Sequence, residues 1–77
     1  MATTPGVEAR FYTLDDVAVI LNVKGAQVYA MVRSGELPAI KVGGRRVWRV
    51  DRQQLNDYIE RMHTETRLWA QEHPLIP

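Results

Sequence analysis

No cysteine occurs among the 77 residues, so disulfide bonds and thiolate metal sites are both excluded. The absence also suits a reducing cytoplasm. Histidine is scarce as well: His63 and His73 are the only two, and they stand ten positions apart. Because a zinc site needs about four ligands close together, we expect no bound metal and no cofactor. No apolar run approaches the roughly 20 residues that a membrane span needs, so we expect no membrane segment.

Catalytic arrangements are missing too. The sequence offers no Ser/His/Asp set, phosphate-binding loop or carboxylate pair in a plausible setting. Its length corresponds to one small domain. A chain near this size buries only about 60% of its unfolded surface, which leaves little room for a catalytic cleft beside a core. We therefore expect a protein that binds rather than an enzyme.

Acidic residues are few in the middle of the chain. From Lys24 to Arg52 there are seven basic residues and only two acidic ones, Glu36 and Asp51, which makes a net charge of +5. The segments before and after it each carry a net charge of −2, so the overall +1 conceals a bipolar chain. A basic block on a small domain is typical of a protein that binds a polyanion.

Two short helices are predicted in the first half. Thr13 can cap a helix over 14–21, and Asn22 suits the left-handed conformation that ends it. Lys24 and Gly25 open a second helix with an apolar stripe, and Gly35 ends it. Helices joined this tightly form either a helix-turn-helix or an ordinary αα-corner, and this segment favours neither.

The next segment decides in favour of the helix-turn-helix. Residues 39–42 and 45–50 resemble strands, and Gly43-Gly44 between them suits a two-residue hairpin turn. A hairpin directly after a helix-turn-helix is a wing. Within it we expect Trp48 and Val50 to lean on the helices. The arginines of the hairpin then project from its tip and outer face.

The chain ends in a long helix. Asp51 caps it, with Gln54 in position for an approximate capping box, and the apolar stripe runs to about Glu72. We expect the part beyond Met62 to project. The prediction is an α+β, mostly helical, winged helix-turn-helix with a two-stranded wing. Its parts are a disordered arm over 1–10, the DNA-binding domain over 11–62 and a helical extension over 63–77.

The second helix and the wing are the predicted DNA-binding surface. The early residues of such a helix meet base edges in the major groove, where Lys24 can reach guanine or a phosphate and Gln27 can pair with adenine. Tyr29 can donate to a phosphate. The competing interpretations are a solvated surface for these residues and, for the wing arginines, a charged strand edge that prevents aggregation. The candidate residues are Lys24, Gly25, Ala26, Gln27, Tyr29, Arg33, Lys41, Gly43, Gly44, Arg45, Arg46 and Arg49.

Leu68 and Trp69 stand out on the last helix. Either the helix folds back and covers the domain, or these residues contact a second protomer or a partner protein, since aromatic residues often anchor interfaces. A tryptophan in an otherwise polar segment tips the prediction slightly toward a protein contact.

Together these residues resemble the excisionase-type DNA-binding domain, a winged helix-turn-helix close to the MerR-type regulators. The resemblance covers about residues 11–60 and is carried by Tyr12–Ala18, Leu21–Val23, Val28–Tyr29, Arg33–Ala39 and Lys41–Arg45. Two departures stand out. The family's usual Ser-Arg-Ser-Thr-like opening is here Lys24–Gln27, and Ala30 replaces a basic residue, which implies weaker base readout. The wing is about two residues longer than in many members.

The resemblance implies one of two functions. An excisionase binds repeated sites on attachment DNA, bends the DNA and directs a tyrosine integrase toward excision. A small transcription regulator is the alternative, and a protein-binding adaptor that uses the fold without DNA is a third. We expect an excisionase from a bacterium or phage, located in the cytoplasm with the nucleoid. Its expected partners are duplex DNA, an integrase and further protomers on adjacent sites.

Overall fold

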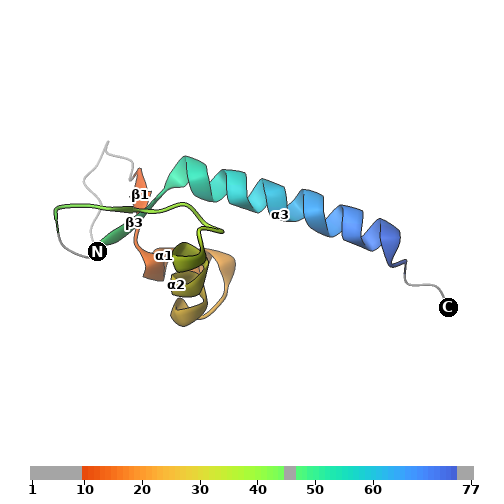
Figure 1. Ribbon diagram of the computed structural model, residues 1–77, viewed down its shortest axis with the longest axis horizontal. Coiled ribbons are helices and arrows are strands. Elements are labelled where there is room, and N and C mark those ends of the chain that lie inside the picture. The colour runs from red at the N-terminus through yellow and green to blue at the C-terminus, as the bar shows by residue number, and fades with distance from the viewer. Residues whose placement is uncertain (1–9, 45–46, 75–77) are drawn as a thin grey trace.

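The computed structural model describes residues 10–44 and 47–74 (Figure 1). Within them lie three helices and a small antiparallel sheet of three strands in the order β1-β3-β2. The strands are β1 (Phe11–Tyr12), β2 (Ile40–Lys41) and β3 (Trp48–Asp51), and the helices are α1 (Leu14–Leu21), α2 (Gly25–Ser34) and α3 (Arg52–Glu72). The mostly helical winged helix-turn-helix is confirmed.

Local capping sets the ends of α1. The Thr13 hydroxyl accepts a hydrogen bond from the Asp16 amide at 2.9 Å, and the Asp16 carboxylate accepts one from the Thr13 amide at 3.0 Å. This reciprocal capping box satisfies amides that the first turn would otherwise leave unpaired. Asn22 ends the helix in the left-handed region, at φ 57°. The predicted bounds and both caps of α1 are therefore confirmed.

The second helix follows after three residues, Asn22 to Lys24. Its N-cap, Lys24, makes no side-chain capping hydrogen bond, whereas Gly35 ends it at φ 83° and donates its amide to the Val32 carbonyl. Glycine adopts that φ without the cost that a Cβ would impose. The predicted bounds of α2 are confirmed as well.

The hairpin differs from its prediction in register. Ile40 pairs with Arg49 and Lys41 with Trp48, and the Val42 amide donates to the Val47 carbonyl at 3.0 Å. Four positions, 43–46, therefore separate the paired residues, and the predicted two-residue turn is wrong. Gly43 and Gly44 have positive φ angles of 79° and 72°, as the predicted two-residue turn requires. The partner of each residue of β2, however, lies two positions further along the chain than that turn would give. A shift of two keeps every side chain on its predicted face.

A third strand was not predicted. Phe11 pairs with Asp51 and Tyr12 with Val50, which places β1 on the other edge of β3. The Arg52 amide donates to the Arg10 carbonyl at 2.8 Å, and the Arg10 guanidinium pairs with Asp51 at 3.2 Å. Arg10, which the sequence prediction placed in the arm, is thus joined to the domain. Residues 1–9 of that predicted arm lie outside the described residues.

One small core lies between the first two helices, β3 and the start of α3. Its fully buried side chains come from every one of these elements and from the loop after α2: Val17, Val28, Leu37, Val50 and Leu55. Met31, Val32 and Tyr58 complete the cluster, and Trp48 packs against it from the wing. The prediction that Val50 and Trp48 lean on the helices is confirmed. No polar side chain is buried in the described part of the chain.

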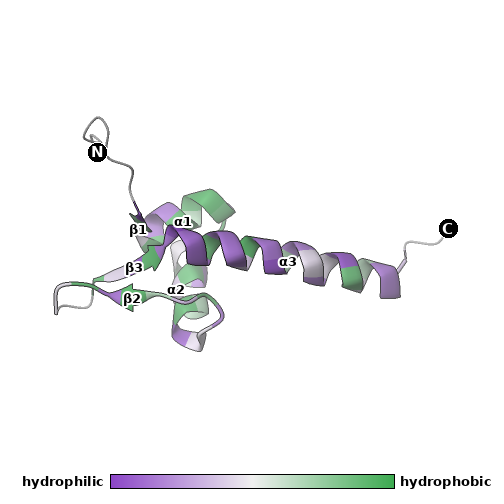
Figure 2. Cartoon of the chain, turned by 90° about the horizontal axis from the view of Figure 1, so that it is seen from above, coloured by the Kyte–Doolittle hydropathy of each residue, from purple (hydrophilic) through white to green (hydrophobic). Residues whose placement is uncertain are grey.

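The last helix begins at the sheet and runs past the domain. Asp51 caps it by accepting from the Gln53 amide at 2.9 Å, and the described residues show no reciprocal hydrogen bond from Gln54. Its first turns pack Leu55 and Tyr58 into the core, whereas residues 63–74 are exposed. The helix accounts for the long axis of the molecule, 51 Å against 29 Å and 19 Å (Figures 1 and 2). The predicted projection beyond Met62 is confirmed.

Leu37→Ala should destabilise the domain by about 2–5 kcal/mol, because it removes a fully buried side chain from a core too small to close around the cavity. Urea unfolding followed by circular dichroism measures the loss. Val19→Ala is the matched control, since the Val19 side chain is 80% exposed and its removal should change the free energy of unfolding by less than about 0.5 kcal/mol. Equal losses from the two variants would contradict this core.

Asp51 should make the domain sensitive to acid. The hydrogen bond from the Gln53 amide, aided by the Arg10 guanidinium, holds the pKa of the Asp51 carboxyl below its usual value of 3.8. A lowered folded-state pKa contributes stability at neutral pH that is lost as the pH falls through that pKa. The difference in melting temperature between wild type and Asp51→Asn should therefore shrink from pH 7 toward pH 2.5. Glu60→Gln, on an exposed part of α3, should show no such trend.

Candidate nucleic-acid interface

The outer face of α2 presents the predicted reading residues to solvent. Lys24, Gly25, Ala26, Gln27 and Ala30 are all exposed. Within the described residues, the side chains of Lys24 and Gln27 make no hydrogen bond or ion pair, so both are available to a ligand. The face carries few donors, as its alanines and glycine predict. Contact of these residues with DNA stays a prediction.

The start of α2 has one acidic neighbour. A Cβ built on Gly25 would lie 3.9 Å from the Asp15 carboxylate, an ordinary van der Waals distance. The absence of a side chain at Gly25 is thus not required by packing within the chain. The carboxylate lies where the positive end of the helix dipole favours negative charge.

A polar notch separates α2 from the sheet. Its lining residues come from both sides, and we call them the helix–sheet notch: Tyr29, Val32, Arg33, Lys41 and Trp48. The Arg33 Nη1 donates to the Tyr29 hydroxyl at 3.0 Å. Across the notch, the Lys41 Nζ lies 5.0 Å from the centre of the Trp48 ring, a cation–π geometry. The sequence prediction contained both cations but not their common setting.

The wing residues divide into three groups. Gly43 and Gly44 are exposed at the turn, and Arg45 and Arg46 lie outside the described residues. Arg49 is half-buried, and its Nη1 donates to the Trp48 carbonyl at 2.8 Å. Arg49 therefore projects less freely than predicted. No described acidic side chain pairs with it.

The one acidic residue between Lys24 and Val50 is held away from this surface. Glu36 accepts a hydrogen bond from the Tyr58 hydroxyl at 3.0 Å, and its carbonyl accepts one from Arg61 at 2.8 Å. Burial, together with the Glu36 hydrogen bond, raises the pKa of Tyr58, so the phenol stays protonated as a donor at neutral pH. Glu36 is thus turned toward α3. The ion pairs recorded among the described residues, Arg10–Asp51 and Arg61–Glu65, include no cation of α2 or β2.

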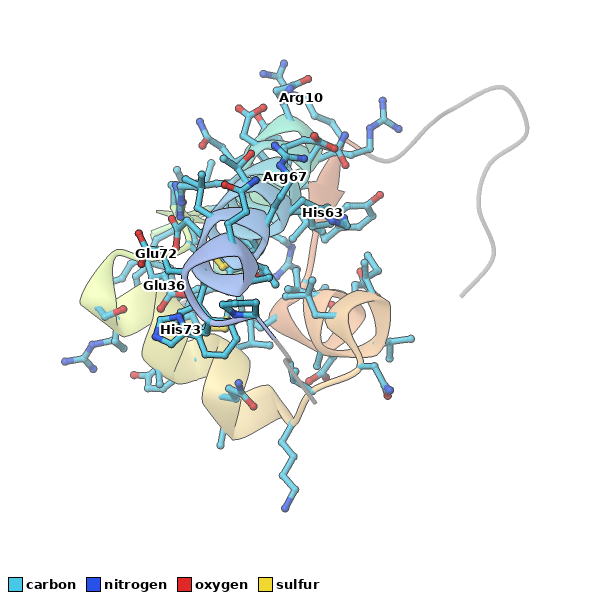
Figure 3. The ribbon with its side chains drawn as sticks, turned by 90° about the vertical axis from the view of Figure 1, so that its right-hand side faces the viewer. Arg10, Glu36, His63, Arg67, Glu72 and His73 are labelled. Carbon is cyan, nitrogen blue, oxygen red and sulfur yellow. The ribbon has the colours of Figure 1, made fainter. Side chains whose placement is uncertain are left out.

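The predicted partner residues lie on the projecting part of α3. Leu68 is 52% and Trp69 60% exposed. The Trp69 ring stacks on His73 with centroids 4.3 Å apart and borders a shallow depression with Met62, Glu65 and Thr66. Seen along α3, Arg67 and His73 point to different sides of the helix (Figure 3). The helix does not fold back as a cover, and a protein contact stays a prediction.

The described residues contain no group of three or more His, Asp or Glu side chains that could hold a metal ion. None of the helices in residues 10–44 and 47–74 is long and apolar enough to cross a membrane.

Comparison with known proteins decides the family. A model described as a helix-turn-helix domain matches residues 11–63, which include all the described elements except the end of α3. The chain belongs to this helix-turn-helix family. The resemblance drawn from the sequence is confirmed at that level. No solved structure matches the chain significantly.

Its curated relatives are bacterial. The uncharacterized protein YvgK of Bacillus subtilis is 37% identical over 67 residues, which cover 87% of this chain and 21% of that protein. The "Putative DNA-binding proteins" MT0521 and Rv0500A of Mycobacterium tuberculosis are each 36% identical over 53 residues, covering 69% of this chain and 65% of theirs. The chain thus spans about a fifth of one relative and just under two thirds of the others.

Sequence reasoning missed the pairing of Lys41 with Trp48, and the reason is the register. A two-residue turn would place Lys41 opposite Arg46, whereas the observed strands place it opposite Trp48. The one signal in the sequence that indicates this pairing is the extra length of the wing.

Proposed function

We propose that this protein binds duplex DNA through one continuous surface, made of the outer face of α2, the helix–sheet notch and the wing. The observation that supports it most is electrostatic. The only acidic side chain from Lys24 to Val50 is hydrogen-bonded toward α3, and no ion pair among the described residues engages the basic side chains of α2 and β2. An acidic side chain does lie near the start of α2, that of Asp15. DNA binding is also what the family and the names of the Mycobacterium relatives indicate.

In this proposal α2 enters the major groove, where Lys24 and Gln27 contact bases or phosphates. The wing, with Arg45, Arg46 and Arg49, follows the adjacent backbone or minor groove, where arginine is favoured. Because α2 offers few donors, base readout is modest. Shape and phosphate contacts then supply much of the affinity.

The finer proposal is an excisionase-type architectural role. It is supported by the resemblance to excisionase-type domains and by an arginine-bearing wing beside a weakly reading helix, which suit a protein that deforms DNA. In it, Leu68 and Trp69 contact another protomer or an integrase. A gel-mobility bending assay and an excision reaction with a cognate integrase test it. Binding without bending or excision would reject it.

A transcription regulator is the second candidate. The observation that favours it is YvgK, in which the matching segment is only about a fifth of the protein, so this module also occurs joined to other chain segments. Footprinting separates the two roles, since a regulator should protect promoter DNA and an excisionase attachment-site DNA.

Binding to a 20-base-pair duplex should weaken steeply with salt. If about five phosphates are neutralised, the slope of log affinity against log salt should be about −4 to −5. Arg45→Gln or Arg46→Gln should each flatten it by about 1 if that side chain meets a phosphate. Arg67→Gln removes the same charge from the projecting helix and should leave it unchanged. Affinity that is absent or independent of salt would instead support a protein-binding adaptor.

The exposed end of α3 should affect DNA binding only when two protomers bind adjacent sites. Leu68→Ala with Trp69→Ala removes two side chains that are more than half exposed, so neither the melting temperature nor single-site affinity should change. Cooperative binding to a duplex with two adjacent sites should fall, as fluorescence anisotropy measures. Ile20→Ala, which removes an exposed apolar side chain from α1, is the control and should retain it. Unchanged cooperativity in the double variant would remove Leu68 and Trp69 from the interface.

A further inference from the structure

We infer that the helix–sheet notch is the binding site for a single DNA backbone phosphate, which Arg33 and Tyr29 of α2 contact from one side and Lys41 of β2 from the other. The inference rests on the proposed DNA binding and adds a specific group of the ligand to it. Arg33 stands in the last turn of α2 and Lys41 is the last residue of β2, so the two cations approach from different elements. All three side chains line the notch.

The charges in the notch suit a phosphate. Its lining contains two cations, one phenol and no carboxylate. Glu36, the acidic residue nearest to Arg33 in sequence, is engaged by Tyr58. Charge-assisted hydrogen bonds to phosphate oxygens are stronger than hydrogen bonds between neutral groups. The Arg33 guanidinium and the Lys41 ammonium group together supply several such donors.

The Tyr29 hydroxyl is set up as a third donor. It accepts a hydrogen bond from the Arg33 Nη1 at 3.0 Å, and a hydroxyl that accepts still has its own proton to donate. Among the described residues this proton has no recorded acceptor. Tyr58 provides the contrast, because its hydroxyl donates to Glu36. The Tyr29 side chain is 44% exposed, so the proton is accessible to a ligand.

The Trp48 ring restrains the Lys41 side chain on the sheet side of the notch. The Lys41 Nζ lies 5.0 Å from the centre of the Trp48 ring, and the ring packs against the core. A lysine confined over an aromatic face loses less freedom on binding than one that moves freely in water. The buried Val32 also lines the notch. The donors are thus arranged before the ligand arrives.

One phosphate bound at this point would connect the helix to the wing. Because α2 and the wing contact different parts of the duplex, a shared phosphate sets their register on the DNA without reading sequence. Arg33 and Lys41 would therefore be positioning residues. Their loss should weaken binding to all sequences alike.

The test uses the chain's two tryptophans and a random-sequence 20-base-pair duplex. Trp69→Phe leaves Trp48 as the single tryptophan, and its emission should change as the duplex binds. Labelled-duplex anisotropy measures affinity in parallel. In this background Tyr29→Phe should lower affinity without changing the salt slope, because it removes a donor and no charge.

The decisive measurement is the double variant Arg33→Gln with Lys41→Gln. Two cations on one phosphate should together flatten the salt slope by about 0.9, whereas cations on two phosphates should flatten it by about 1.8. Affinity at fixed salt should fall by at least about tenfold. Circular dichroism and the melting temperature verify that each variant is folded, and Arg67→Gln is the charge-matched control.

The outcomes separate the two proposals. A decrease of about 1.8 in the steepness of the salt slope would overturn the proposed phosphate site and leave the proposed DNA binding intact. Unchanged Trp48 emission while anisotropy reports bound duplex would have the same meaning. Failure of the Trp69→Phe protein and of the wild type to bind the duplex at low salt would overturn both. Binding with an altered Trp48 signal and a flattening near 0.9 would support both.

Discussion

The pairing of β3 with its two neighbours is the constraint on which the rest of this small domain depends. β3 hydrogen-bonds to β1 on one edge and β2 on the other, and it contacts both α1 and α3. Its Val50 side chain is fully buried, and its last residue, Asp51, caps the long helix. A four-residue strand thereby sets the position of the wing, the packing of the core and the direction of α3. In a chain this short, the buried area that secures such a strand is limited, so each core side chain matters.

The position of the proposed DNA-binding surface follows from that arrangement. β3 places the Trp48 ring opposite Lys41 and beside α2, which creates the notch between helix and wing. Tyr58 and Arg61 of α3 hold Glu36 through hydrogen bonds, so in the proposed DNA complex this carboxylate would not oppose the basic segment. Fold and electrostatics are therefore coupled: the helix that completes the core also holds Glu36, the only acidic residue between Lys24 and Val50, away from the proposed DNA-binding face.

Membership of the helix-turn-helix family is consistent with this division of roles. Two relatives carry DNA-binding in their names, and another contains the module as a minor part of a longer chain. In this protein the end of α3 that carries Leu68 and Trp69 is exposed, and the proposed contact with another protein would use that end.

The sequence by itself determined the helices. Thr13, Asn22, Gly35 and Asp51 act on their own neighbours through capping hydrogen bonds or backbone conformation, and such short-range effects can be seen in the order of residues. The basic block, the apolar stripes and the exposure of Lys24 and Gln27 were equally predictable. Only the tertiary structure decided the strand register, the third strand, the meeting of Lys41 with Trp48 and the capture of Glu36 by Tyr58. These depend on which distant residues pack together, and the energies that choose between registers come from contacts across the whole core rather than from any local motif.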